Sequence, residues 1–251
     1  MDKIYQEKVF ITSNDVDDHY DLKISTIFKY LQQVSTNHSE LLGIGMRETL
    51  EHNMFWVIAR MDVKVFKMPK MLETLTVTTH PGDLMMFMFP RFYEVYNELG
   101  ELCISASAAW VLLDKDTHSV VNKPYGEGYT FKGISLPEDI PLPKRVITDN
   151  LVKIESRKVR YSDIDLNGHL NNTKYIDYII DTHDINFYKK YCVNEILINF
   201  EKEISDSDIV DIYSQRPYSK SVVCADETSR SSREGPDKGY LCQNFEVQVN
   251  D

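Results

Sequence analysis

The segment from Val159 to Tyr175 holds the residue types best suited to chemistry. It reads VRYSDIDLNGHLNNTKY, and Asp165, Asn167 and His169 follow one another at intervals of two. If this stretch is extended, such spacing directs all three side chains to one side. A carboxylate, an amide and an imidazole would then lie beside a helix N-terminus, whose free N–H groups stabilise developing negative charge. The pattern indicates general acid–base chemistry, although each residue alone is also common in turns and caps.

An internal repeat surrounds this segment. Asp163-Ile164-Asp165 lies 148 residues after Asp15-Val16-Asp17, and both end a strand-like run and lead into a helical pattern. In the first copy, apolar residues recur at steps of three and four from Ile24 to Leu41. Gly43 and Gly45 are expected to end that helix.

The second copy has its own helical pattern. Apolar residues from Tyr175 to Ile180, followed by His183, lie at helical spacing. They come after Asn171 and Asn172, either of which can cap a helix N-terminus. Each copy is therefore expected to hold one principal helix.

Strand-like runs rich in β-branched and aromatic residues follow each helix. They are Trp56–Phe66, Leu72–Thr79, Met85–Tyr96 and Leu102–Leu113 in the first copy, and Glu195–Glu203, Ile209–Tyr213, Val222–Ala225 and Tyr240–Val249 in the second. One strand, one long helix and several antiparallel strands, repeated, predict an α+β fold.

Composition excludes several function classes. The chain has 251 residues, with 28 Lys and Arg against 39 Asp and Glu, a formal charge of −11. Neither a nucleic acid nor an anionic membrane is an expected partner of so acidic a chain. Residues 1–10 lack the apolar segment of a signal peptide, so we expect a cytoplasmic protein. The four cysteines lie far apart, and GxGxxG, Walker and HExxH motifs do not occur, so we expect neither cofactor nor metal.

The second-copy motif resembles a known family. The run Asp163-x-Asp165-x-Asn167-x-His169-Leu-Asn171-Asn172-x-Lys174-Tyr175 is similar to the signature of the acyl-acyl carrier protein thioesterases of plant plastids and bacteria. The first copy resembles the same family through Leu31-Gln32-Gln33, Asn37-His38, Trp56 to Met61, and ASAAWVLL at 106–113. The resemblance implies two tandem hotdog domains, each a long helix wrapped by an antiparallel sheet. We expect an acyl-binding domain at 1–131, a linker at 132–150 and a catalytic domain at 151–251.

The resemblance also implies a glutamate on the strand after the second helix, and Glu203 matches it. The plant enzymes follow this glutamate with a cysteine, where this chain has Ile204, which cannot attack a thioester. The candidate catalytic set is thus Asp165, Asn167, His169 and Glu203. Asp165 or Glu203 would accept the water proton, Asn167 would position water or carbonyl, and His169 would donate a hydrogen bond or carry a proton.

Comparison of the copies predicts one active site per chain. At the offset of 148 residues, the first copy has His19 in place of Asn167 and Asp21 in place of His169. On the later strand, Phe66-Lys67-Met68-Pro69 pairs with Phe200-Glu201-Lys202-Glu203, so that Pro69 replaces Glu203. Only the second copy therefore has all four polar residues of the candidate catalytic set, called here the polar set. Combined substitution of Asp15 and Asp17 is therefore expected to leave hydrolysis unaffected.

The favoured function is hydrolysis of fatty acyl-acyl carrier protein to free fatty acid, which ends fatty-acid synthesis. Two alternatives stay open. Tyr161-x-Asp163-x-Asp165-x-x-Gly168 is also similar to acyl-CoA thioesterases of the wider hotdog group, and hotdog domains can bind acyl groups without turning them over. The expected partner is an acyl carrier protein, and a homodimer stays open. The candidate docking patch is Lys144, Arg145, Lys153, Arg157, Lys158 and Arg160, whose alternative role is a solvated linker and strand face.

Overall fold

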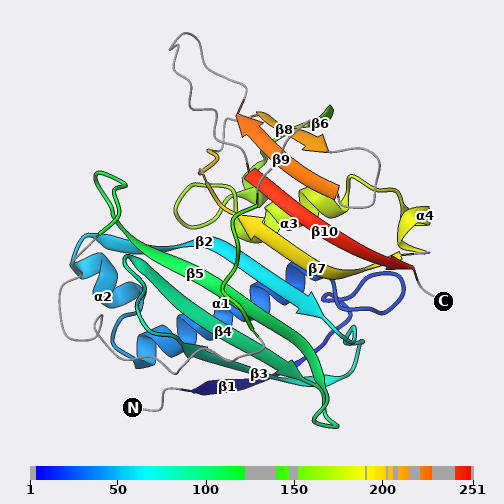
Figure 1. The fold of residues 1–251 in the computed structure, drawn as a ribbon, viewed down its shortest axis with the longest axis horizontal. Helices are drawn as coiled ribbons and strands as arrows, with labels where there is room; N and C mark the ends of the chain where they lie inside the picture. Colours follow the sequence, from blue (N-terminus) through cyan, green and yellow to red (C-terminus); the bar gives the residue numbers. More distant parts are fainter. Residues whose placement is uncertain are drawn as a thin grey trace. The chain divides into compact units, whose positions relative to one another are not determined.

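The chain divides into two compact units, Met1–Lys144 and Arg145–Asp251, called here the N-terminal and C-terminal units (Figure 1). The computed structural model describes residues 4–121, 140–146, 152–189, 191–201, 203–205, 209–214, 221–227 and 241–249. Most of the expected linker at 132–150 lies outside these described residues. Among them, no helix has the length and apolar character needed to cross a membrane.

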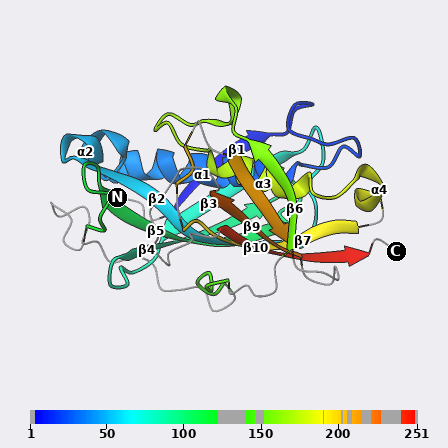
Figure 2. The same cartoon turned by 90° about the horizontal axis from the view of Figure 1, so that it is seen from above.

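The N-terminal unit is an antiparallel sheet with one long helix. Its strands lie in the order β1 (Tyr5–Phe10), β3 (Thr74–Pro81), β4 (Met88–Tyr96), β5 (Leu102–Asp114) and β2 (Met54–Val65). Helix α1 (Ile24–Leu41) lies along one face of this sheet and packs against β1 and β3 (Figure 2). A short helix, α2 (Met46–Glu51), which the sequence pattern did not predict, leads into β2.

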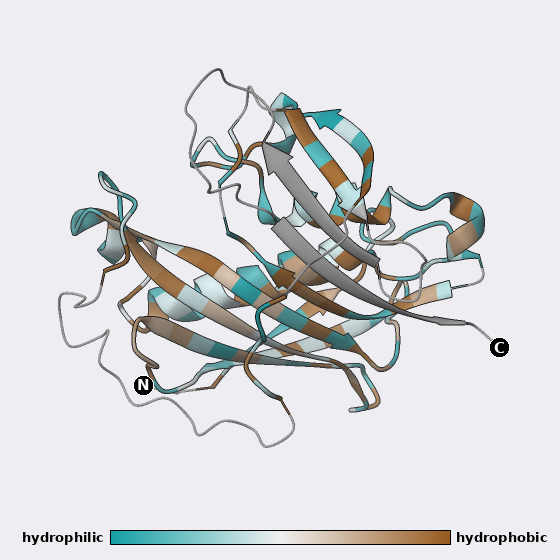
Figure 3. Cartoon of the chain, turned by 45° about the horizontal axis from the view of Figure 1, so that its top comes forward, coloured by the Kyte–Doolittle hydropathy of each residue, from teal (hydrophilic) through white to brown (hydrophobic). Residues whose placement is uncertain are grey.

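The apolar spacing of α1 explains its place. Ile27, Phe28, Leu31 and Val34 recur at steps of one, three and three, and each is almost fully buried. Gly43 follows the helix with φ +72°, and its N–H donates to the carbonyl of Glu40. The expected helix and its glycine end are confirmed. Figure 3 shows hydrophobic residues concentrated along the strands of this unit.

The C-terminal unit repeats the same strand order. Its strands are β6 (Val152–Lys158), β8 (Ile209–Ser214), β9 (Ser221–Glu227), β10 (Leu241–Val249) and β7 (Tyr191–Asn199), all antiparallel to their neighbours. Its helices are α3 (Asn172–Ile180) and α4 (Ile185–Tyr188). Helix α3 begins 148 residues after α1, which is the offset of the sequence repeat. Both units are thus α+β, as expected.

Several element boundaries differ from the expectation. β7 ends at Asn199, so Glu203 lies beyond the strand on which it was expected. β4 begins at Met88, because Met86 turns back with φ +58°. His183 lies past the end of α3 because Asp184 caps the next helix, its Oδ1 accepting the N–H of Phe187 at 2.9 Å.

Candidate active site

Residues Ile164 to Leu170 form a tight hairpin between β6 and α3. Ile164 and Leu170 are bridged in antiparallel fashion, and the N–H of Asp165 donates to the carbonyl of His169 at 2.8 Å. Gly168 turns the chain with φ +83°, in the left-handed region that favours glycine. The expectation of an extended stretch is therefore wrong here, because the chain reverses between Asp165 and His169.

The carboxylate of Asp165 holds this hairpin closed. Its Oδ1 accepts the N–H of Asn167 at 2.8 Å and the N–H of His169 at 3.2 Å. Its Oδ2 accepts no hydrogen bond from any residue that the structure describes, and the side chain is half-buried. One oxygen is thus structural, while the other remains available to a water molecule.

Asp165 and His169 lie opposite each other across the hairpin, and cross-strand partners project to the same face. Asn167 lies instead at the exposed tip. The hairpin therefore places Asp165 and His169 opposite each other by reversal of the chain rather than by strand alternation.

Glu203 reaches this hairpin from the segment after β7. The N–H of Leu170 donates to the carbonyl of Ile204 at 2.7 Å, and His169 is bridged to Ser205. This pairing places His169 Nε2 at 3.5 Å from Glu203 Oε2. The two side chains are 27% and 34% exposed, so solvent reaches them.

The start of α3 lies directly after this hairpin. Asn171 is its cap, because its Oδ1 accepts the N–H of Thr173 at 2.9 Å. The choice between Asn171 and Asn172, which the sequence left open, thus falls on Asn171.

The N-terminal unit contains the same hairpin without the same side chains. Asp17 Oδ1 accepts the N–H of His19 at 2.9 Å and the N–H of Asp21 at 3.0 Å. The position of Gly168 is taken by Tyr20, whose φ is +63°. Asp21 forms an ion pair with Lys70 at 2.5 Å, at the place where the second copy has His169 beside Ser205.

The backbone pairing of each hairpin with the segment after the long strand corrects which residue of the first copy is equivalent to Glu203. The N–H of Leu22 donates to the carbonyl of Pro69 at 2.9 Å, as Leu170 does to Ile204. Pro69 therefore matches Ile204, and Met68 matches Glu203. The expected pairing of Phe66–Pro69 with Phe200–Glu203 was wrong by one residue, because four residues separate the end of β7 from Ile204 and three separate the end of β2 from Pro69. A methionine thioether neither accepts a proton nor pairs with an imidazole, so the polar set is still confined to the second copy.

One group of side chains has the ligand types of a metal site. Asp17, Asp18 and His19 bring their donor atoms within 4.8 Å of one another, and all three are exposed. Asp17 already accepts two backbone amides in its own turn. Exposed acidic groups commonly cluster in this way without a bound ion.

Family models match both halves of the chain. Residues 2–124 match the acyl-ACP thioesterase N-terminal domain, where ACP is acyl carrier protein, and residues 148–246 match the acyl-ACP thioesterase C-terminal domain. The chain belongs to the acyl-ACP thioesterase family. The resemblance that the motif indicated is thereby confirmed.

Curated members of the acyl-ACP thioesterase family show low identity to the chain. It is 24% identical over 223 residues to a chloroplastic palmitoyl-acyl carrier protein thioesterase of Arabidopsis thaliana, covering 82% of this chain and 54% of the relative. It is 24% identical over 263 residues to oleoyl-acyl carrier protein thioesterase 2 of the same plant, covering 94% and 71%. The chain thus spans about half the length of the first of these relatives.

Solved structures from the family share the fold. An acyl-ACP thioesterase from Bacteroides thetaiotaomicron is similar with a TM-score of 0.86 at 19% identity, covering 98% of both chains. The 12:0-ACP thioesterase from Umbellularia californica is similar with a TM-score of 0.83 at 17% identity, covering 100% of this chain and 99% of that chain. The expected fold class, tandem hotdog domains of α+β type, is confirmed.

Proposed function

We propose that this chain hydrolyses fatty acyl-ACP to a free fatty acid and the carrier protein. The observation that supports this most is the contact of His169 Nε2 with Glu203 Oε2 at 3.5 Å. His169 lies on the hairpin that the Asp165 carboxylate closes, and Glu203 reaches it from the segment after β7. The equivalent hairpin in the N-terminal unit lacks these groups. Family membership supplies the substrate class, since the similar curated proteins are named as acyl carrier protein thioesterases.

The reaction needs a water molecule, a base and a proton donor for the thiolate. Asp165 Oδ2 takes one proton from water as the water oxygen attacks the thioester carbonyl carbon. The C–S bond then breaks, and the thiolate sulfur takes a proton from the imidazolium of His169. Glu203, whose Oε2 lies 3.5 Å from His169 Nε2, holds the imidazole in place for that transfer. After the fatty acid leaves, the proton on Asp165 passes to His169 through water, which restores both groups. Asn167, at the tip of the hairpin, donates a hydrogen bond to the water or to the carbonyl oxygen.

The acyl chain is assigned to the N-terminal domain, residues 1–131, and the chemistry to residues 151–251. The support for this division is the distribution of polar groups. Asp21 in the first hairpin is neutralised by Lys70, and Met68 matches Glu203. A cytoplasmic location and a homodimer are further proposals that no contact among the described residues tests.

The proposed function is tested by thiol release from a panel of acyl-ACP thioesters. Hydrolysis with a higher kcat/KM than for the same acyl group on CoA supports it. A preference for CoA favours the acyl-CoA alternative. Binding of acyl-ACP without thiol release identifies a non-catalytic acyl-binding module and refutes the proposal.

The docking patch is smaller than the sequence indicated. Three of its six cations are held by carboxylates within the C-terminal unit: Arg145 by Glu201 at 3.3 Å, Lys153 by Asp211 at 2.6 Å, and Arg157 by Glu155 at 2.6 Å and Asp181 at 2.8 Å. Lys144, Lys158 and Arg160 are exposed, and none of them forms an ion pair with any residue that the structure describes. Lys158 and Arg160 come directly before the active-site hairpin in the chain, so they are the unpaired cations of the patch best placed for an acidic carrier protein.

Reversal of these two charges is expected to weaken carrier recognition. Lys158→Glu with Arg160→Glu should lower kcat/KM for acyl-ACP about tenfold at low salt, because the double variant repels an acidic partner. The same acyl group on N-acetylcysteamine, a neutral thiol without protein or phosphate, should be hydrolysed at the wild-type rate. The matched control is Lys8→Glu with Lys189→Glu, two exposed cations elsewhere. Equal losses in both double variants would show a net-charge effect rather than docking.

A further inference from the structure

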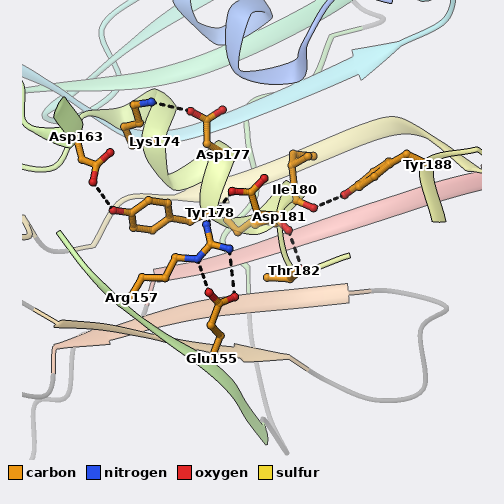
Figure 4. A network of polar contacts seen from close by, with 11 residues as sticks. Glu155, Arg157, Asp163, Lys174, Asp177, Tyr178, Ile180, Asp181, Thr182 and Tyr188 are labelled. Carbon is orange, nitrogen blue, oxygen red and sulfur yellow. Dashed lines mark hydrogen bonds and ion pairs between the residues drawn. The ribbon is translucent and has the colours of Figure 1, made fainter. Parts of the chain in front are cut away.

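The start of the active-site hairpin is fixed by Asp163. Its Oδ2 accepts the N–H of Arg160 at 2.9 Å. The same oxygen accepts the hydroxyl of Tyr178, on α3, at 2.8 Å (Figure 4). The carbonyl of Asp163 accepts the N–H of Asn171, the residue just after the hairpin, at 2.8 Å. Asp163 therefore ties both ends of the hairpin to each other and to the middle of the helix.

The N-terminal unit has the same brace at the same offset of 148 residues. Asp15 Oδ2 accepts the N–H of Thr12 at 2.9 Å, and the carbonyl of Asp15 accepts the N–H of Lys23 at 2.9 Å. The hydroxyl of Tyr30, on α1, donates to the carboxylate of Asp15. An aspartate held by a helix tyrosine is thus common to both copies, whichever side chains follow in the hairpin.

A second contact exists only in the C-terminal unit. The guanidinium of Arg157, on β6, lies over the ring of Tyr178, 5.2 Å from its centroid. The same guanidinium donates to Glu155 on its own strand at 2.6 Å and to Asp181 at the end of α3 at 2.8 Å (Figure 4). At the same offset the first copy has Val9 in place of Arg157, which can make none of these contacts. An arginine therefore packs against the ring of the helix tyrosine only in the C-terminal unit, which also holds Asp165, His169 and Glu203.

The brace keeps its hydrogen bonds over a wide pH range. Burial, and then the hydrogen bond to the Asp163 carboxylate, raise the pKa of Tyr178, so its hydroxyl stays a donor. Burial lowers the pKa of Arg157, but the contacts with Glu155 and Asp181 outweigh it and raise that pKa overall. Neither group changes its charge under conditions in which a thioester is stable.

We propose that Tyr178 and Arg157 are positioning residues for the reaction of Asp165 and His169. This proposal rests on the proposed function. The hydroxyl of Tyr178 fixes the carboxylate of Asp163. Asp163 holds the two ends of the hairpin together, and the hairpin in turn places Asp165 opposite His169. Arg157 fixes the tyrosine ring by binding both β6 and the end of α3. Neither residue touches the reacting atoms.

The test compares Tyr178→Phe with Tyr30→Phe. Each variant removes one hydroxyl that donates to an aspartate at the start of a hairpin, and each keeps the ring, so both should lower Tm by similar amounts. Only Tyr178→Phe should lower kcat, by about tenfold, with KM changed less than twofold, because small misplacements of reacting groups are costly. Arg157→Lys, which keeps the cation but loses the planar fork, should lower kcat by a smaller factor than Arg157→Met.

NMR spectra test the positioning role of Tyr178 independently of whether the protein hydrolyses thioesters. In NMR spectra the amide signals of Asn167 and His169, which donate to Asp165, should move in Tyr178→Phe and stay in place in Tyr30→Phe. If wild type hydrolyses no thioester, the proposed function fails, and these signals still decide whether Tyr178 positions the hairpin. Unchanged amide signals in Tyr178→Phe, or equal losses of kcat in the two tyrosine variants, would overturn the positioning proposal.

Discussion

Replacement of Asp165 by Asn is expected to lower kcat at least about 100-fold and to leave the fold intact. The side-chain carbonyl of Asn can still accept the N–H groups of Asn167 and His169, so the hairpin keeps its closing hydrogen bonds. The amide cannot accept a proton from water at neutral pH. The loss of kcat therefore measures the chemical role of Oδ2 and not the structural role of Oδ1, which accepts the two backbone N–H groups.

The chain supplies a matched control for this substitution. Asp17→Asn makes the same change in the hairpin of the N-terminal unit, where Asp17 accepts two amides in the same way. Its kcat should equal that of wild type, and the two variants should have similar Tm values. We would measure kcat on acyl-ACP and thermal unfolding for both. A wild-type rate in Asp165→Asn would remove the proposed base, and an equal loss in Asp17→Asn would contradict the assignment of one active site per chain.

Periodic features of the sequence predicted the fold well. The three-and-four spacing from Ile24 to Leu41 has a direct physical cause, burial of one helix face, and α1 has those bounds. The offset of 148 residues holds from β1 and β6 through both hairpins to the starts of α1 and α3, because the copies share local hydrogen bonds. Local hydrogen-bonding devices such as the Asn171 cap are also readable from residue type.

Contacts between distant elements were not readable in the same way. Asp165, Asn167 and His169 were expected on one side if the stretch were extended, but a turn at Gly168 places Asp165 opposite His169 and leaves Asn167 at the tip. Arg157 has the residue type of a docking cation, yet it forms an ion pair with Asp181, 24 residues later in the chain. Pairing of that kind depends on where α3 ends relative to β6, which no local pattern determines.

The positioning role of Tyr178 had a signal that the sequence reasoning missed. Tyr30 and Tyr178 are separated by the repeat offset, as are Asp15 and Asp163. A search of both copies for paired polar and aromatic residues at that offset would have found this brace. The Arg157 clamp has no such signal, because Val9 takes its place in the first copy.

Replacement of His169 by Ala is expected to lower kcat about 100-fold or more, because the leaving thiolate loses its proton donor. Glu203→Gln should lower kcat only about tenfold if Glu203 acts through His169, since an amide oxygen keeps the polar contact with the imidazole 3.5 Å away but carries no negative charge. The control is Asp21→Ala at the equivalent place in the first hairpin, which should leave kcat unchanged.

The double variant His169→Ala with Glu203→Gln decides between the two roles of Glu203. Side chains that act as a unit give non-additive losses, so the double variant should be no slower than His169→Ala alone. A product of the two single losses would instead show that Glu203 acts independently of the imidazole. In that case Glu203, and not Asp165, would be the stronger candidate for the base, and the loss in Glu203→Gln alone should then equal or exceed the loss in Asp165→Asn. The four rates, measured on one acyl-ACP, therefore assign the two carboxylates.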